Sequence, residues 1–180
     1  LNIYTNQRHL AVSYGLSLLI IYLFLKFKID DKHVISKSIV IGIILGFSFI
    51  LNMAVFLMTI IILFCILLFL KGRRKFIFIV LILGMIIAIP QYLYTQSSES
   101  IFKITINPGY LVTGLNVINF INYWVQNVGL HIILIPLGFL VASKISKKIL
   151  ISFFSLFLIG NLFQFSPEID ANHKFINYFI

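Results

Sequence analysis

The sequence contains little charge and very little acid. Only five of its 180 residues are Asp or Glu, and charged residues of both signs make up 11% of the chain. Soluble domains carry about 25% charged residues, so this composition excludes an ordinary water-soluble protein. The chain also has a single cysteine, Cys65, inside an apolar run. One cysteine excludes an internal disulfide framework and a cysteine-based metal site.

Apolar residues are abundant instead. They make up 61% of the chain, with 19 Phe and eight Tyr, and the mean hydropathy is +1.08. These values predict a polytopic, all-α integral membrane protein. The net charge of +9 could indicate a nucleic-acid partner, but the basic residues lie in short segments between apolar runs. The positive-inside rule explains that arrangement better, so we expect a bilayer and no nucleic acid as partner.

One uncharged, strongly apolar run, Ile39–Leu70, is too long for one span. As a single helix it would extend about 48 Å, against a hydrocarbon core of about 30 Å. We therefore expect a break near Ser48–Asn52, with Asn52 as a cap, rather than one tilted helix. Farther on, Pro136 predicts a kink. The predicted spans are residues 9–25, 39–51, 53–70, 76–94, 118–143 and 149–163, with outer loops at 95–117 and 164–174.

The basic residues set the orientation. Eleven of the fourteen Lys and Arg fall in three segments, 26–38, 71–75 and 144–148, which we assign to the cytoplasmic side. Glu99, Glu168 and Asp170 then lie outside. The sequence thus predicts one transmembrane domain over residues 1–180 in the plasma membrane, with its chemistry on the extracytoplasmic face. The chain starts without Met and stops inside an apolar segment, so we expect a fragment of a longer protein.

A row of polar residues, here called the polar seam, lies within the apolar segment Asn116–Ser143. Its residues recur at spacings of three and four, which places them on one helical face. They either line a hydrated cavity open to the outside or form hydrogen bonds between packed helices. His131 alone is more typical of a hydrogen-bonding residue than of a metal ligand. The seam consists of Asn116, Asn119, Tyr123, Gln126, Asn127 and His131.

The segment Gln164–Lys174, QFSPEIDANHK, gathers polar groups in a chain that otherwise avoids them. Glu168 and Asp170, with His173 and Lys174 close behind, could supply a general base, a metal-binding carboxylate or a cationic clamp for a phosphate. The alternative is a charged loop that only caps a membrane helix.

Three segments carry a resemblance to a family: Gly42–Leu57, Asn122–Gly138 and Asn161–Phe179. They resemble largely uncharacterised prokaryotic membrane proteins that look like GT-C-type glycosyltransferases. The most specific residues are Trp124, Asn127 and Gly129, together with Pro167 and Asn172–Lys174. The resemblance implies a polyprenyl-phosphate sugar as donor and an active site on the extracytoplasmic face.

The resemblance also implies residue roles. Asp170 and Glu168 are the catalytic candidates, while the main acid is expected in a loop before Leu1. Asn52 and Ala54 stand where relatives often have two His, and Ala171 stands where they often have Asp. No metal ligand is assigned, and a divalent metal ion is the one cofactor left open. The implied substrate and phosphate ligands are Asn172, His173, Lys174, Trp124, Asn127, Gln126, Tyr123 and Asn119.

The leading hypothesis is therefore a glycosyltransferase-like membrane protein with a lipid-linked sugar as substrate. One alternative is a transporter or flippase for a lipid-linked or anionic solute, which would produce flux without a glycosyl product. Past His131 the helix that carries the seam is apolar as far as Ser143, which favours an outward-open pocket over a through-path. Another alternative is a non-catalytic assembly subunit.

Overall fold

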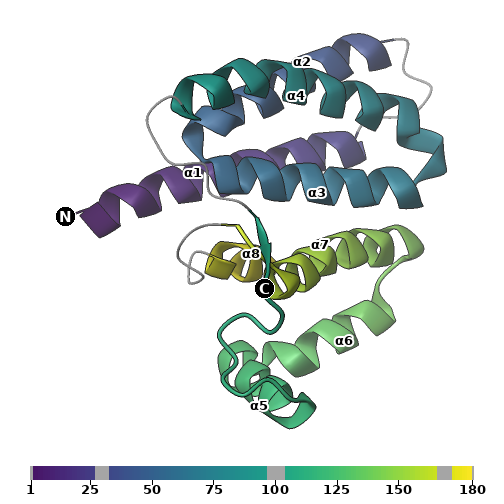
Figure 1. The fold of residues 1–180 in the computed structure, drawn as a ribbon. Coiled ribbons are helices and arrows are strands. Elements are labelled where there is room, and N and C mark those ends of the chain that lie inside the picture. Colours follow the sequence, from purple (N-terminus) through teal and green to yellow (C-terminus); the bar gives the residue numbers. More distant parts are fainter. Residues whose placement is uncertain (1, 27–32, 97–103, 166–171, 180) are drawn as a thin grey trace. The chain divides into compact units, whose positions relative to one another are not determined.

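The computed structural model describes residues 2–26, 33–96, 104–165 and 172–179, and its secondary structure there is helical apart from two strands of two residues each (Figure 1). This confirms the predicted all-α class. The chain divides into two compact units, Leu1–Ile101 and Phe102–Ile180, which we describe separately. The first contains α1 (Asn2–Lys26), α2 (Val34–Leu51), α3 (Met53–Phe69), the 3-10 turn η1 (Lys71–Arg73) and α4 (Arg74–Gln96).

Asn52 divides the long apolar run into two helices, as predicted. Its backbone is extended, and its side-chain oxygen accepts a hydrogen bond from the Val55 N–H at 3.1 Å. This is the N-cap arrangement that satisfies a free donor in the first turn of a helix. The Phe49 ring meets the Phe56 ring across the break, with centroids 5.4 Å apart. The predicted cap role of Asn52 is confirmed.

Contacts between residues of α2 and residues of α4 show that these two helices run in the same direction. Gly42 lies against Val80 and Leu83, and the Phe49 ring lies 6.4 Å from the Tyr92 ring. Because α3 connects the end of α2 to the start of α4, it must run in the opposite direction. Helices α2 and α3 therefore form the expected hairpin (Figure 1).

Glycines allow α2 and α4 to approach closely. A Cβ atom added at Gly42 would lie 2.8 Å from the Leu83 Cβ, and one at Gly46 would lie 2.5 Å from the Ile87 Cβ. Gly84 on α4 is equally constrained by Leu45. Two glycines four residues apart are typical of tight helix pairs in membranes. Their role is helix packing, whereas the predicted break depends on Asn52.

The described basic residues at the end of α1 and the start of α4 lie at the same end of the first unit. α1 runs alongside α3, because Ser17 and Thr59 share a hydroxyl hydrogen bond of 2.6 Å and the Phe24 and Phe76 rings lie 5.7 Å apart. The Arg73 guanidinium donates to the backbone carbonyls of Phe24 and Leu25. A cation at a helix C-terminus satisfies free carbonyls and stabilises the helix dipole.

The described residues of the second unit form a short antiparallel strand pair and four helices. Strands β1 and β2 pair Thr105 with Gln164 and Ile106 with Phe163. The two segments that were assigned to the outer side are thus joined by backbone hydrogen bonds. The elements are β1 (Thr105–Ile106), α5 (Val117–Val128), α6 (His131–Val141), α7 (Lys144–Leu162), β2 (Phe163–Gln164) and α8 (His173–Phe179).

The predicted span 118–143 is not one helix. It bends by 84° between α5 and α6, at Gly129, whose φ of +55° ends α5. This bend was not predicted; Pro136, where the sequence predicts a kink, lies seven residues farther on, inside α6. Two boundaries also differ from the sequence expectation. The basic segment 144–148 begins α7 rather than forming a loop, and His173 and Lys174 lie on α8 rather than in the outer loop.

Within the described residues, three helical segments are long and apolar enough to cross a membrane: Val34–Leu51, Lys71–Thr95 and Lys144–Leu162. The bent pair of α5 and α6 makes four if it counts as one span. Leu10–Lys26 and Met53–Phe69 are shorter apolar helices. These helices indicate a membrane protein.

Candidate functional site

Aromatic rings from three segments of the second unit surround Trp124 on α5. The Trp124 ring is stacked with Tyr110 at 6.1 Å and meets Tyr123 edge-on at 5.1 Å and Phe157 of α7 at 4.7 Å. Trp124 is buried, whereas Tyr110 and Tyr123 are half-buried. Aromatic pairs in such geometries add about 0.5–1.5 kcal/mol to area burial. Trp124 therefore fixes two tyrosines at the edge of a packed cluster.

The loop that carries Tyr110 is attached to the end of α7. The Asn107 N–H donates to the Leu162 carbonyl at 2.9 Å, and the Gly109 N–H donates to the Asn161 carbonyl at 2.8 Å. This loop includes the turn predicted at Asn107–Gly109, which the structure confirms. Tyr110 itself has a φ of +58°, in the left-handed region. Such a conformation costs a bulky residue about 1–3 kcal/mol, so its surroundings must hold it there.

Two buried polar atoms beside this cluster have no hydrogen-bond partner in the described part of the chain. They are the Trp124 Nε1 donor and the Asn161 Oδ1 acceptor. Both side chains flank Phe157, because the Asn161 amide donates to the Phe157 carbonyl at 2.8 Å. An unsatisfied buried polar group costs about 1–3 kcal/mol. Both atoms are closed off from solvent, so the packing of the cluster must offset this cost.

Asn172 connects the end of α7 to the start of α8. Its buried side-chain amide donates to the Gly160 carbonyl at 2.9 Å and to the Phe163 carbonyl at 2.5 Å. Its oxygen accepts from the Phe165 N–H at 3.4 Å. The predicted ligand Asn172 thus uses both ends of its amide to hold the backbone.

His173 and Lys174, which were predicted to bind phosphate, follow Asn172 directly. His173 and Lys174 form the first turn of α8, where His173 is exposed and Lys174 is half-buried. The helix itself is held against α7, since a Cβ atom added at Gly160 would lie 3.1 Å from the Phe175 Cβ. Asn172 therefore fixes the position of this basic pair relative to the end of α7. The predicted acids Glu168 and Asp170, with Pro167, lie outside the described residues.

The polar seam lies on the surface of α5, and its bonds are local. Asn116 caps the helix by accepting from the Asn119 N–H at 2.8 Å. The Asn119 amide donates to the Gly114 carbonyl at 2.8 Å, and the Asn127 amide donates to the Tyr123 carbonyl at 2.7 Å. Gln126 is exposed. The bonds of Asn116 and Asn119 shape the loop before α5 and its first turn, and that of Asn127 stays within α5.

His131 is separated from the seam by the bend. It opens α6, and its Nδ1 atom lies 3.2 Å from the Val128 carbonyl. The expectation that all seam residues share one continuous helical face was therefore wrong for His131, because Gly129 reorients the chain. Among the described residues, no group of three or more His, Cys, Asp or Glu could hold a metal ion.

The site also contains residues that the sequence did not single out. Tyr110, Phe157 and Asn161 complete the surroundings of Trp124, although they come from a loop and from an apolar helix. Two features of the sequence could have indicated these residues: a turn followed by Tyr, and an Asn within an apolar run. Comparison with known proteins adds no further residues, because no family model, curated protein or solved structure matches the chain.

Proposed function

We propose that this protein is a glycosyltransferase-like membrane protein of GT-C type, which takes a sugar from a polyprenyl-phosphate donor at the extracytoplasmic face. The observation that supports this most is the pairing of β1 with β2. It holds the loop with Tyr110 at the end of α7, where Asn172 also anchors the start of α8 with His173 and Lys174. Aromatic rings and a basic pair are the groups that a sugar phosphate requires.

The position along α7 supports the proposed face. The basic residues Lys144, Lys147 and Lys148 begin this helix, and β2 follows its last residue. Nineteen helical residues separate the two ends by about 27 Å, close to the thickness of a hydrocarbon core. If α7 crosses the membrane with its basic end in the cytoplasm, the site opens on the extracytoplasmic side. A six-span arrangement with the α2–α3 hairpin belongs to the same proposal.

In this proposal each residue has a specific role. Tyr110 and Tyr123 present their rings to the sugar, and the buried Trp124 holds them in place. His173 and Lys174 stabilise the phosphate that leaves. Asn172 is a positioning residue, because its own amide is bonded to the backbone. Asp170 and Glu168 stay candidates for the base that activates the acceptor hydroxyl.

The test is binding of a polyprenyl-phosphate sugar to the purified protein in lipid nanodiscs. We expect the double variant His173→Ala with Lys174→Ala to bind at least about tenfold more weakly, since a hydrogen bond to a charged group contributes about 1.5–3 kcal/mol. Lys144→Ala, at the other end of α7, is the matched control and should bind normally. Unchanged binding by the double variant would contradict the proposed role.

Transfer is measured separately from binding. Mass spectrometry should detect a sugar on an added lipid or polyol acceptor only when the donor is present. Donor flux across proteoliposomes without any glycosyl product would refute glycosyl transfer and favour transport.

A further inference from the structure

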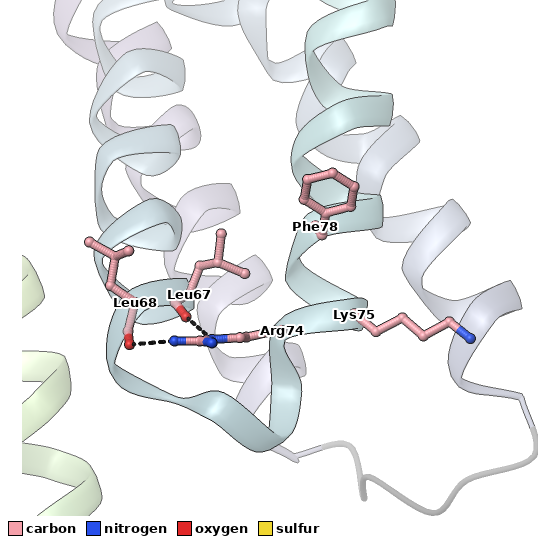
Figure 2. A pocket seen from close by; sticks show the side chains of 5 residues that line it. All are labelled: Leu67, Leu68, Arg74, Lys75 and Phe78. Carbon is pink, nitrogen blue, oxygen red and sulfur yellow. Dashed lines mark hydrogen bonds between the residues drawn. The ribbon is translucent and has the colours of Figure 1, made fainter.

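A shallow groove lies at the basic end of the first unit, between the end of α3 and the start of α4 (Figure 2). Its volume is about 500 Å³. Three apolar side chains and two basic ones line it: Leu67, Leu68, Phe78, Arg74 and Lys75. A groove of this composition suits a ligand that is anionic at one end and apolar along the rest.

The Arg74 guanidinium is held in a fixed position at this groove. Its Nε donates to the Leu67 carbonyl at 3.2 Å and one terminal nitrogen donates to the Leu68 carbonyl at 3.3 Å (Figure 2). Those carbonyls end α3, so Arg74 caps that helix. A guanidinium has five N–H donors. Arg74 therefore keeps donors for an oxyanion while its position is already set.

Lys75 provides a second charge. In Figure 2 its side chain extends to the opposite side of α4 from Arg74, and its stem lines the groove. It is exposed and has no hydrogen-bond or ion-pair partner among the residues that the structure describes. A lysine stem of four carbons reorients freely, so the ammonium can turn towards an anion near Arg74.

The groove continues onto apolar surface. Leu68 and Phe78 are 52% and 56% exposed. Both flank the start of Lys71–Thr95, one of the segments long and apolar enough to cross a membrane. If this segment crosses a bilayer with its basic start at the surface, Arg74 and Lys75 lie at the depth of lipid headgroups, and Leu68 and Phe78 lie where acyl chains begin.

We propose that this groove is a binding site for an anionic phospholipid. The headgroup phosphate contacts the free donors of Arg74 and the ammonium of Lys75, and an acyl chain lies along Leu68 and Phe78. This property is independent of glycosyl transfer, because it uses only residues of the first unit. A free phosphate would satisfy the charges but would leave the apolar part of the groove unused.

The experiment titrates the purified protein in neutral detergent with phosphatidylglycerol, using native mass spectrometry to count bound lipid. Phosphatidylcholine serves as the neutral reference lipid. We expect Lys75→Gln to weaken phosphatidylglycerol binding about fivefold and Arg74→Gln by at least as much, as each basic residue near a membrane surface contributes a factor of this size. Lys75→Gln disturbs no recorded hydrogen bond, so it tests the site without altering the end of α3.

The matched control is Lys26→Gln, a lysine at the end of α1 that lies 5.6 Å from the Tyr22 ring centroid and outside the groove. It should bind phosphatidylglycerol like the unmodified protein. An equal loss in this control would show that overall charge, and not the groove, binds the lipid.

Full displacement by an equal concentration of glycerol phosphate would also overturn the proposal, because a soluble anion would then suffice. Phe78→Ser should weaken lipid binding, and unchanged binding would refute the acyl contact.

Discussion

The side-chain amide of Asn172 donates a hydrogen bond to the backbone carbonyl of Gly160, twelve residues earlier in the chain. Gly160 lies in the last turn of α7, where backbone carbonyls lack partners within the helix. One buried side chain thus satisfies the end of α7 and sets the start of α8. The resemblance assigned Asn172 to substrate binding, and this geometry gives it a positioning role next to His173 and Lys174.

Replacing Asn172 should destabilise the second unit. Asn172→Ala leaves the Gly160 and Phe163 carbonyls without their donor, and we expect a loss of about 2–3 kcal/mol. Asn172→Asp keeps the acceptor but removes both donors, so it should lose a similar amount. Thermal unfolding of the purified protein in detergent measures the change. Asn177→Ala, on the exposed face of α8, is the control and should leave the midpoint unchanged. A normal midpoint for Asn172→Ala would contradict this role.

The sequence was sufficient to predict the first unit in some detail. The length of Ile39–Leu70 made one span physically impossible without a large tilt, and Asn52 was the polar residue best placed to end a helix. Both arguments use distance and capping, which depend on local sequence alone. For this reason the hairpin and its cap agree with the structure.

The second unit could be predicted only in part. The bend at Gly129 depends on the left-handed φ of a single glycine, which hydropathy along the sequence does not reveal. The surroundings of Trp124 depend on contacts between separate segments: Tyr110 stacks on Trp124 of α5, and the loop at Gly109 bonds Asn161, about fifty residues later in the chain. Such long-range contacts leave no periodic signal in one sequence.

Close packing of α2 on α4 predicts that Gly46 tolerates no larger residue. Gly46→Val would place a Cβ atom 2.5 Å from the Ile87 Cβ, so the helices must separate. We expect a loss of about 1–3 kcal/mol in unfolding free energy, measured by denaturant titration in mixed micelles. Gly15→Ala on α1 is the matched control, since no atom lies within 4 Å of its added Cβ. Equal stability of Gly46→Val and the unmodified protein would show that the close approach is absent in solution.

The buried hydroxyl pair of Ser17 and Thr59 should couple α1 to α3. Their oxygen atoms lie 2.6 Å apart, and Thr59 also bonds the Val55 carbonyl. Polar pairs between membrane helices contribute about 0.6 kcal/mol on average, so a double-mutant cycle with Ser17→Ala and Thr59→Val should give a coupling energy near that value. Strictly additive effects of the two substitutions would mean that the pair contributes nothing.

Gly129 should be required for the bend between α5 and α6. Its φ of +55° and ψ of −129° lie in a region that residues with a Cβ rarely adopt, although no atom lies within 4 Å of an added Cβ. The cost of Gly129→Ala is therefore conformational, and we expect a loss of about 1–3 kcal/mol. Gly138→Ala on α6 also has open space around its Cβ but occupies a helical position, so it should be neutral or stabilising.

The comparison is made by thermal unfolding together with Trp124 fluorescence, because straightening the bend would move α5 and the Trp124 ring away from Phe157. If both alanine variants unfold at the same temperature with unchanged fluorescence, the bend does not depend on the backbone conformation of Gly129.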